Sequence, residues 1–152
     1  MIRKVLLAAA ALIAVLVVFG LVMYVMNPAP AVPAVSAADA ANPEKPYVVK
    51  IHAQWCAVCM VTKGVWSEIE NAYSGRVNLL VLDVTNQATT DASRAEAKRL
   101  GLEQFFDEHS GGTGTILVLD GRTRLVTASI SGSRDFAEYR AAIDATLRGT
   151  HR

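Results

Sequence analysis

Residues 47–59 read YVVKIHAQWCAVC, and this segment decides the fold of the chain. Its first seven residues are mostly apolar and predict a buried strand over 47–53. Cys56 and Cys59, the only two cysteines in the sequence, follow almost at once. The next residues, 60–73, carry apolar side chains at helical spacing and predict a helix. A Cys-x-x-Cys pair placed where a strand turns into a helix is typical of thiol–disulfide chemistry.

The spacing of the two cysteines suits a disulfide that opens and closes. Residues three apart on a helix have Cβ atoms about 5–6 Å apart, and a small rotation brings them to disulfide distance. Cys56 falls in the first turn, where unpaired amides and the helix dipole stabilise a thiolate. Cys59 lies one turn deeper, so we expect it to be less exposed. We therefore predict that Cys56 is the nucleophile, that Cys59 is the resolving thiol, and that the two form a redox-active disulfide.

Two other interpretations of the pair stay open. Cys56 and Cys59 could hold a soft ion such as Cu(I) together with His52, although strand alternation favours a different direction for the histidine. The domain could also be a binding module without catalysis. A zinc site is not predicted, because the sequence has no second Cys-x-x-Cys. We predict no metal and no cofactor.

The N-terminus predicts a membrane anchor. Arg3 and Lys4 precede residues 5–26, which carry no charge. A helix of that length is roughly 33 Å long, enough to span the hydrocarbon core of a bilayer. The basic start should stay in the cytoplasm, which exports everything after residue 26. We predict a single-pass inner (plasma) membrane protein with a periplasmic or extracytoplasmic domain. The alternative is a cleaved signal peptide, whose apolar core is usually shorter.

Residues 27–46 form a predicted linker, and residues 47–152 form the predicted domain. The linker holds all five prolines of the chain among many alanines, which favours an extended conformation. The domain holds 12 Lys and Arg against 12 Asp and Glu. This balance gives no electrostatic case for nucleic acid binding. A lone cysteine pair in an exported domain fits an oxidising compartment.

The rest of the domain alternates between strand-like and helix-like segments. Strands are predicted over 76–84, 115–119 and 124–130, the last as an antiparallel edge strand after a hairpin at Asp120-Gly121. Helices are predicted from Thr90 or Asp91 to Leu100, over 102–109, and from Ser133 or Asp135 to about Arg148. The order β-α-β-α-β-β-α predicts an α/β fold with a mixed sheet.

This order, with the cysteine pair at the first strand–helix junction, resembles the thioredoxin family. Val48 to Met60 looks like the active-site strand and helix of that family, with Trp55 in the tryptophan position before the nucleophile. The resemblance covers 47–148 and implies a three-layer sandwich around a central mixed sheet. It also implies a thiol–disulfide oxidoreductase, similar to membrane-tethered, exported members. Its partners would be exported protein thiols or disulfides and a membrane or soluble electron donor.

The predicted surroundings of the cysteines depart from that family in three places. Gly114, after Thr113, stands where the family has a cis-proline facing the cysteines, so we expect a trans bond and a different client groove. Lys50 stands where classical thioredoxins bury an aspartate, and we expect its side chain to reach the surface. Ala57 and Val58, between the cysteines, include no histidine, which favours a reducing or electron-relaying role.

Overall fold

The computed structural model describes residues 16, 19, 42 and 44–150. The predicted anchor and linker, residues 1–26 and 27–46, therefore lie almost wholly outside the described residues. Within the described part of the chain, no helix has the length and apolar character needed to cross a membrane. The chain divides into two units, Met1–Ser36 and Ala37–Arg152, and the fold below is that of the second.

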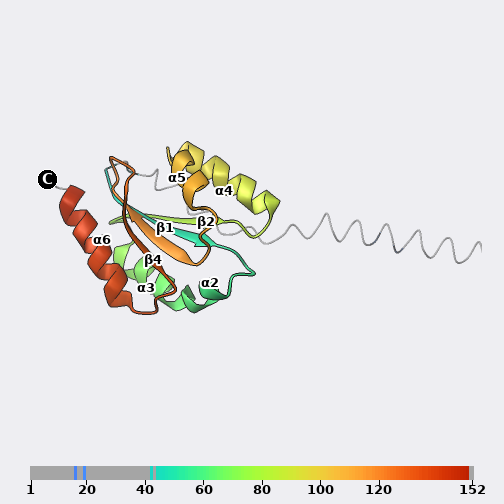
Figure 1. Ribbon diagram of the computed structural model, residues 1–152, viewed down its shortest axis with the longest axis horizontal. Helices are drawn as coiled ribbons and strands as arrows, with labels where there is room; N and C mark the ends of the chain where they lie inside the picture. Colours follow the sequence, from blue (N-terminus) through green and yellow to red (C-terminus); the bar gives the residue numbers. More distant parts are fainter. Residues whose placement is uncertain (1–15, 17–18, 20–41, 43, 151–152) are drawn as a thin grey trace, which may run out of the picture. The chain divides into compact units, whose positions relative to one another are not determined.

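Four strands form one mixed sheet in the order β2-β1-β3-β4 (Figure 1). They are β1 (Tyr47–His52), β2 (Asn78–Asp83), β3 (Thr115–Leu119) and β4 (Val126–Ser131). β1 pairs in parallel with β2 and antiparallel with β3, and β3 pairs antiparallel with β4. β1 is therefore central, with neighbours on both sides and helices over both faces, which explains its nearly continuous apolar sequence.

Helices cover both faces of the sheet and give the predicted three layers (Figure 1). α2 (Ala57–Val61), α3 (Lys63–Tyr73) and α6 (Phe136–Thr150) lie on one side, and α4 (Gln87–Arg99) and α5 (Glu103–His109) lie on the other. Alternate residues of β1 pack against the helices on opposite faces of the sheet. Val49 packs with Phe105 and Phe106 under α5, whereas Val48 packs with Ile69 of α3 and Ile143 of α6.

Three predicted boundaries were wrong. The helix expected over 60–73 is two helices, because the buried Thr62 hydroxyl hydrogen-bonds the carbonyls of Val58 and Cys59 where α2 ends. α4 begins at Gln87 rather than after Thr90, since Asn86 and Thr89 form a capping box. β4 begins at Val126 rather than 124, because Arg124 belongs to the hairpin turn with a φ of 63°.

Candidate functional site

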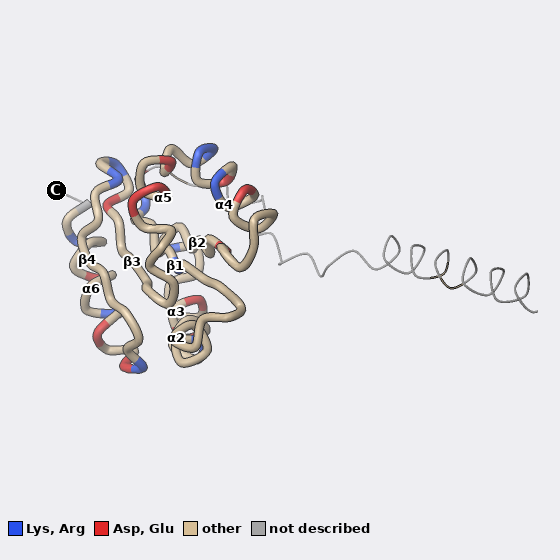
Figure 2. Tube along the Cα trace, turned by 45° about the vertical axis from the view of Figure 1, so that its right-hand side comes forward, with Lys and Arg blue, Asp and Glu red and all other residues tan. Residues whose placement is uncertain are grey.

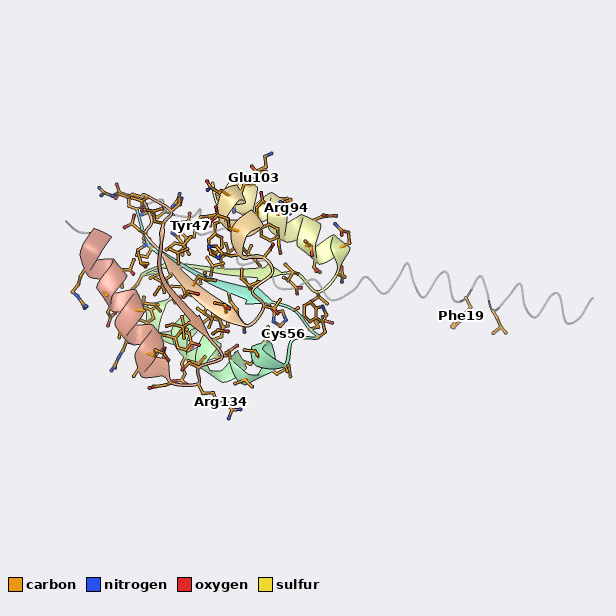
Figure 3. The ribbon with its side chains drawn as sticks, viewed as in Figure 1. Phe19, Tyr47, Cys56, Arg94, Glu103 and Arg134 are labelled. Carbon is orange, nitrogen blue, oxygen red and sulfur yellow. The ribbon has the colours of Figure 1, made fainter. Side chains whose placement is uncertain are left out.

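The turn between β1 and α2 is fastened to the end of the neighbouring strand. Thr85 follows β2, and its hydroxyl accepts a hydrogen bond from the Gln54 amide at 2.9 Å. The Thr85 carbonyl accepts a second one from the Trp55 indole at 3.0 Å. Because β1 and β2 are parallel, their carboxyl ends meet at one edge of the sheet. These two bonds hold the turn that leads to Cys56 in place. Figure 3 labels Cys56 in this part of the molecule.

Cys56 is the N-cap of α2. Its backbone is extended, with φ −85° and ψ 109°, and its Sγ accepts a hydrogen bond from the Cys59 amide at 3.0 Å. The sulfur therefore takes the place that a serine or aspartate oxygen usually holds at a helix start. A negative charge on that sulfur would face otherwise unpaired amides.

Hydrogen bonds lower the pKa of the Cys56 thiol below its ordinary value. Burial by itself raises this pKa, but the bonds from the thiol of Cys59, the Thr113 hydroxyl and the amides of Cys59 and Val58 together outweigh it. These donors stabilise the thiolate more than the thiol, and the thiolate is the attacking species.

The pKa of Cys59 moves in the opposite direction. Burial raises it, and so does the hydrogen bond that Cys59 gives to Cys56. The Cys59 sulfur lies 3.8 Å from the carbonyl oxygen of Ile51. Both thiols are free, so the described state is the reduced one. One sulfur is set up to ionise first and the other to hold its proton.

Both cysteines are nearly covered, which the sequence did not indicate. Cys59 is 2% exposed and is the less exposed residue, as expected, but Cys56 is only 6% exposed. Gly114 explains the cover, because an added Cβ there would lie 2.6 Å from Val58 Cγ1 and 3.3 Å from Cys56 Sγ. The loop can approach this closely only with glycine. No described peptide bond is cis, so the expected trans bond before Gly114 is confirmed.

Gly114 also holds its loop against the first strand. Its φ is +86°, a region that favours glycine, and its amide donates to the Ile51 carbonyl at 2.9 Å. Thr113 and Gly114 thus reach the thiol from the start of β3. Residues 51–62, which carry both cysteines, contain no Asp, Glu, Lys or Arg. Figure 2 shows charged residues on α3, α4, α5 and α6.

The expectation that Lys50 reaches the surface was wrong. Lys50 is 5% exposed, and its Nζ lies 5.6 Å from the centre of the Trp66 ring. Burial is the main cause that lowers the pKa of this amine, while the charges of Cys59, Glu70 and Cys56 act in the other direction. The neighbouring strands and α3 leave the side chain too little room to extend into solvent.

The three-ligand copper site is not assembled. No group of three or more His, Cys, Asp or Glu side chains in the described part of the chain could hold a metal ion, and His52, Cys56 and Cys59 all lie within it. The His52 Nδ1 atom is buried without a hydrogen-bond partner. Burial lowers the pKa of this histidine, while nearby Asp83 acts to raise it.

The remaining predicted residues lie on the outside of the site. Trp55 is 66% exposed and Val58 is 38% exposed, and Ala57 is exposed at the start of α2. Sequence reasoning missed Thr85 and Trp66. Thr85 could have been found from the parallel pairing of the first two strands, because it follows β2 at the edge where the cysteines lie.

Comparison with known proteins agrees with this arrangement. The thioredoxin family model matches residues 35–98. The solution structure of a thioredoxin-like protein in the oxidized form aligns with a TM-score of 0.50 at 13% identity. It covers 76% of this chain and 86% of its own. The chain has a thioredoxin-like fold.

Two further structures with this fold are similar at lower scores. One is a thiol:disulfide interchange protein of the thioredoxin family from Chlorobium tepidum TLS, with 21% identity, TM-score 0.48, and coverage of 69% of this chain and 81% of its own. The other is a DsbF homologue from Corynebacterium diphtheriae, with 19% identity, TM-score 0.47, and coverage of 73% and 76%. No curated protein sequence matches the chain.

Proposed function

We propose that this protein is a thiol–disulfide oxidoreductase that works through Cys56 and Cys59. The observation that carries the proposal is the opposite tuning of two adjacent thiols. Hydrogen bonds at the start of α2 favour the thiolate of Cys56, while burial keeps the proton on Cys59. A purely structural pair would need no such difference.

The reaction proceeds in two exchanges. The Cys56 thiolate attacks one sulfur of a client disulfide, so a Cys56–client bond forms and the other client sulfur leaves as a thiolate with the electron pair. Cys59 then loses its proton and attacks Cys56 Sγ. The Cys56–Cys59 bond forms, and the bond to the client breaks. The second client sulfur leaves as a thiolate, and both client thiolates take up protons. The client gains two electrons and the protein becomes a disulfide.

The direction and setting of this exchange belong to the same proposal. The protein reduces, or relays electrons to, exported protein disulfides, and a membrane or soluble donor restores its dithiol. Residues 5–26 anchor it in the inner membrane with the thioredoxin-like domain outside the cytoplasm. The support is the uncharged segment behind Arg3 and Lys4. A reporter enzyme active only outside the cytoplasm, fused after residue 46, should be active, and an inactive fusion would contradict this topology.

Insulin disulfide reduction tests the chemistry on the full chain. With dithiothreitol as electron source, the wild-type protein should accelerate insulin reduction, and Cys56→Ser should abolish the acceleration. Cys59→Ser should also stop turnover, and when it is mixed with insulin without dithiothreitol it should keep a mixed disulfide on Cys56. Ser110→Ala, on the loop before β3 and with no bond to either thiol, serves as the matched control. Equal rates for wild type and Cys56→Ser would refute the proposed function.

A further inference from the structure

Lys50 is a buried cation in the middle of the sheet. On β1 it lies between Val81 of β2 and Ile116 of β3. Its side chain is on the same face of β1 as Val48, toward the layer that contains Trp66. A lysine in such a place loses most of its hydration, and a nearby negative charge helps it to keep its proton.

The groups that can supply this charge come from three elements. The thiols of Cys56 and Cys59 lie at the start of α2, and the Cys59 sulfur lies 3.8 Å from the carbonyl oxygen of Ile51, the residue that follows Lys50 on β1. Negative charge on either thiol acts electrostatically on Lys50. Glu70 of α3 also acts on it, but this carboxylate is exposed and accepts a hydrogen bond from the Trp66 indole at 2.6 Å. Lys63 of α3 and His52 of β1 are the nearby groups that can be positive. The two thiols are therefore the buried groups that can become anionic beside Lys50.

These thiols are anionic only when the pair is reduced. We propose that Lys50 is the charge partner of the reduced cysteines, so that its proton affinity follows the redox state of the Cys56–Cys59 pair. This inference rests on the proposed function and adds a proton-linked control to it. Lys50 acts through the thiols and touches no client, so it is a positioning residue rather than a catalytic one.

The step at which Lys50 matters most is the resolving attack. When Cys56 is bonded to a client, the Cys59 thiol must lose its proton before it can attack Cys56 Sγ. The Lys50 ammonium stabilises the resulting thiolate electrostatically. The Cys56–Cys59 bond then forms, the client sulfur leaves with the electron pair, and the released proton ends on that sulfur through solvent. Closing the disulfide removes the anion and leaves Lys50 without its partner.

Linkage makes the effect reciprocal. If reduction makes Lys50 hold its proton more tightly, the protonated lysine must favour the reduced pair by the same factor. Lys50 then raises the reduction potential above that of a site with a neutral residue there. The oxidised protein becomes easier for its electron donor to reduce again.

The most direct test uses the wild-type full chain. The side-chain nitrogen of Lys50 can be titrated by NMR in the oxidised and in the reduced protein, with its signal assigned from its loss in Lys50→Arg. We expect the proton affinity of Lys50 to be roughly tenfold higher in the reduced protein, because a thiolate interacts strongly with an ammonium in a partly desolvated site. Equal titration of Lys50 in both states would overturn the inference.

A variant pair tests the reciprocal effect. Lys50→Met keeps most of the length of the side chain and removes its charge, whereas Lys63→Met removes an exposed charge from α3. In equilibrium with glutathione, Lys50→Met should shift the pair roughly tenfold toward the disulfide, about 30 mV. Lys63→Met should shift it less than about twofold. An unchanged equilibrium in folded Lys50→Met contradicts the inference. If that variant does not fold, the NMR comparison decides.

These results separate the inference from the proposed function. If the wild type reduces insulin but Lys50 titrates equally in the oxidised and reduced protein, only the role of Lys50 is refuted. Absence of turnover with a redox-dependent titration would remove the function and leave the electrostatic coupling intact.

Discussion

The thiol of Cys56 is made acidic by the hydrogen bonds that its sulfur accepts, and not by exposure to solvent. The residue is only 6% exposed. Its sulfur accepts a hydrogen bond from the Cys59 amide at 3.0 Å, and this bond and those from neighbouring donors lower the pKa of the thiol. Because the pKa is lowered, the thiolate exists in a pH range in which an ordinary cysteine, with a pKa of about 8.5, is still protonated. This pH range extends from the lowered pKa of Cys56 up to about the pKa of an ordinary cysteine.

Thr113→Val tests this account at a single hydroxyl. Removing the Thr113 donor should raise the pKa of Cys56 and slow its alkylation near pH 7 by several-fold, since less thiolate is present. At pH 10, where Cys56 is ionised in both the wild type and Thr113→Val, the two alkylation rates should converge. The measurement is the pH profile of iodoacetamide labelling in reduced protein.

Ser110→Ala is the control for Thr113→Val, because it removes a hydroxyl from the same loop region without touching the thiol. Its pH profile should match the wild type. A Thr113→Val profile that also matches the wild type would show that the hydroxyl does not stabilise the thiolate.

Gly114→Ala tests the close approach of the loop. The added Cβ would lie 2.6 Å from Val58 Cγ1, and the φ of +86° is strained for alanine. Denaturant unfolding of the full chain should show a loss of about 1–3 kcal/mol. Gly111→Ala, where nothing lies within 4 Å of the added Cβ, should change stability by less than about 0.5 kcal/mol.

The part of the Gly114→Ala loss that comes from crowding should depend on Val58. Adding Val58→Ala to Gly114→Ala should recover some stability and leave the backbone strain in place. Equal losses at Gly111 and Gly114 would contradict the proposed packing of the loop on the thiol.

At the scale of elements, the site depends on hydrogen bonds between the segment that follows β1 and the segment that follows β2. Thr85, beyond β2, fastens the turn that leads from β1 into α2 through the Gln54 amide and the Trp55 indole. The indole bond goes to a backbone carbonyl and survives any substitution at residue 85. The amide bond depends on the threonine hydroxyl.

Thr85→Val should therefore loosen the turn without unfolding the protein. Because Gln54 is exposed and water can replace the lost partner, the cost should be about 1 kcal/mol. Hydrogen exchange should speed up selectively at residues 54–57. Thr90→Val removes a hydroxyl that bonds the Asn86 carbonyl within α4, and should leave that turn unchanged. Unchanged exchange in Thr85→Val would refute the role of Thr85.

Elements with a strong apolar pattern were predicted well from the sequence. The predicted strands 47–53, 76–84 and 115–119 correspond to β1, β2 and β3, because buried strands need apolar residues on both faces. The start of α4 was missed, since residues 87–90, QATT, look like a polar loop until Asn86 is recognised as the cap. The break between α2 and α3 at Thr62 was also missed. It depends on a buried hydroxyl, which hydrophobic periodicity does not report.

At the scale of the whole molecule, the site is assembled from segments that are distant in sequence. The cysteine turn, the end of β2 at Thr85 and the loop at 113–114 meet at one edge of the sheet. The Cys-x-x-Cys pair and the assignment of Cys56 as the first thiol to ionise could be predicted from local spacing. The burial of Lys50 could not, because it depends on β2 and β3 flanking the strand and on Trp66 covering it.

The family match and the fold complement each other at this scale. Residues 35–98 carry the thioredoxin match, and β3, β4 and α6 complete the sheet and its second helical layer beyond it. Gly114 lies in this second part. The cysteine pair thus lies in the matched segment, and the loop that covers it lies beyond that segment.

The most direct test of the central claim is a competition between the two sulfurs. Full-length Cys59→Ser and Cys56→Ser, each with a single cysteine, are mixed with oxidised glutathione at pH 7, and the adduct is followed by mass spectrometry. We predict rapid adduct formation on Cys56 and, in the other variant, formation on Cys59 slower by at least about tenfold, because burial raises the pKa of Cys59. Adduct formation on Cys59 at the same or a greater rate would contradict the assignment of Cys56 as the attacking thiol.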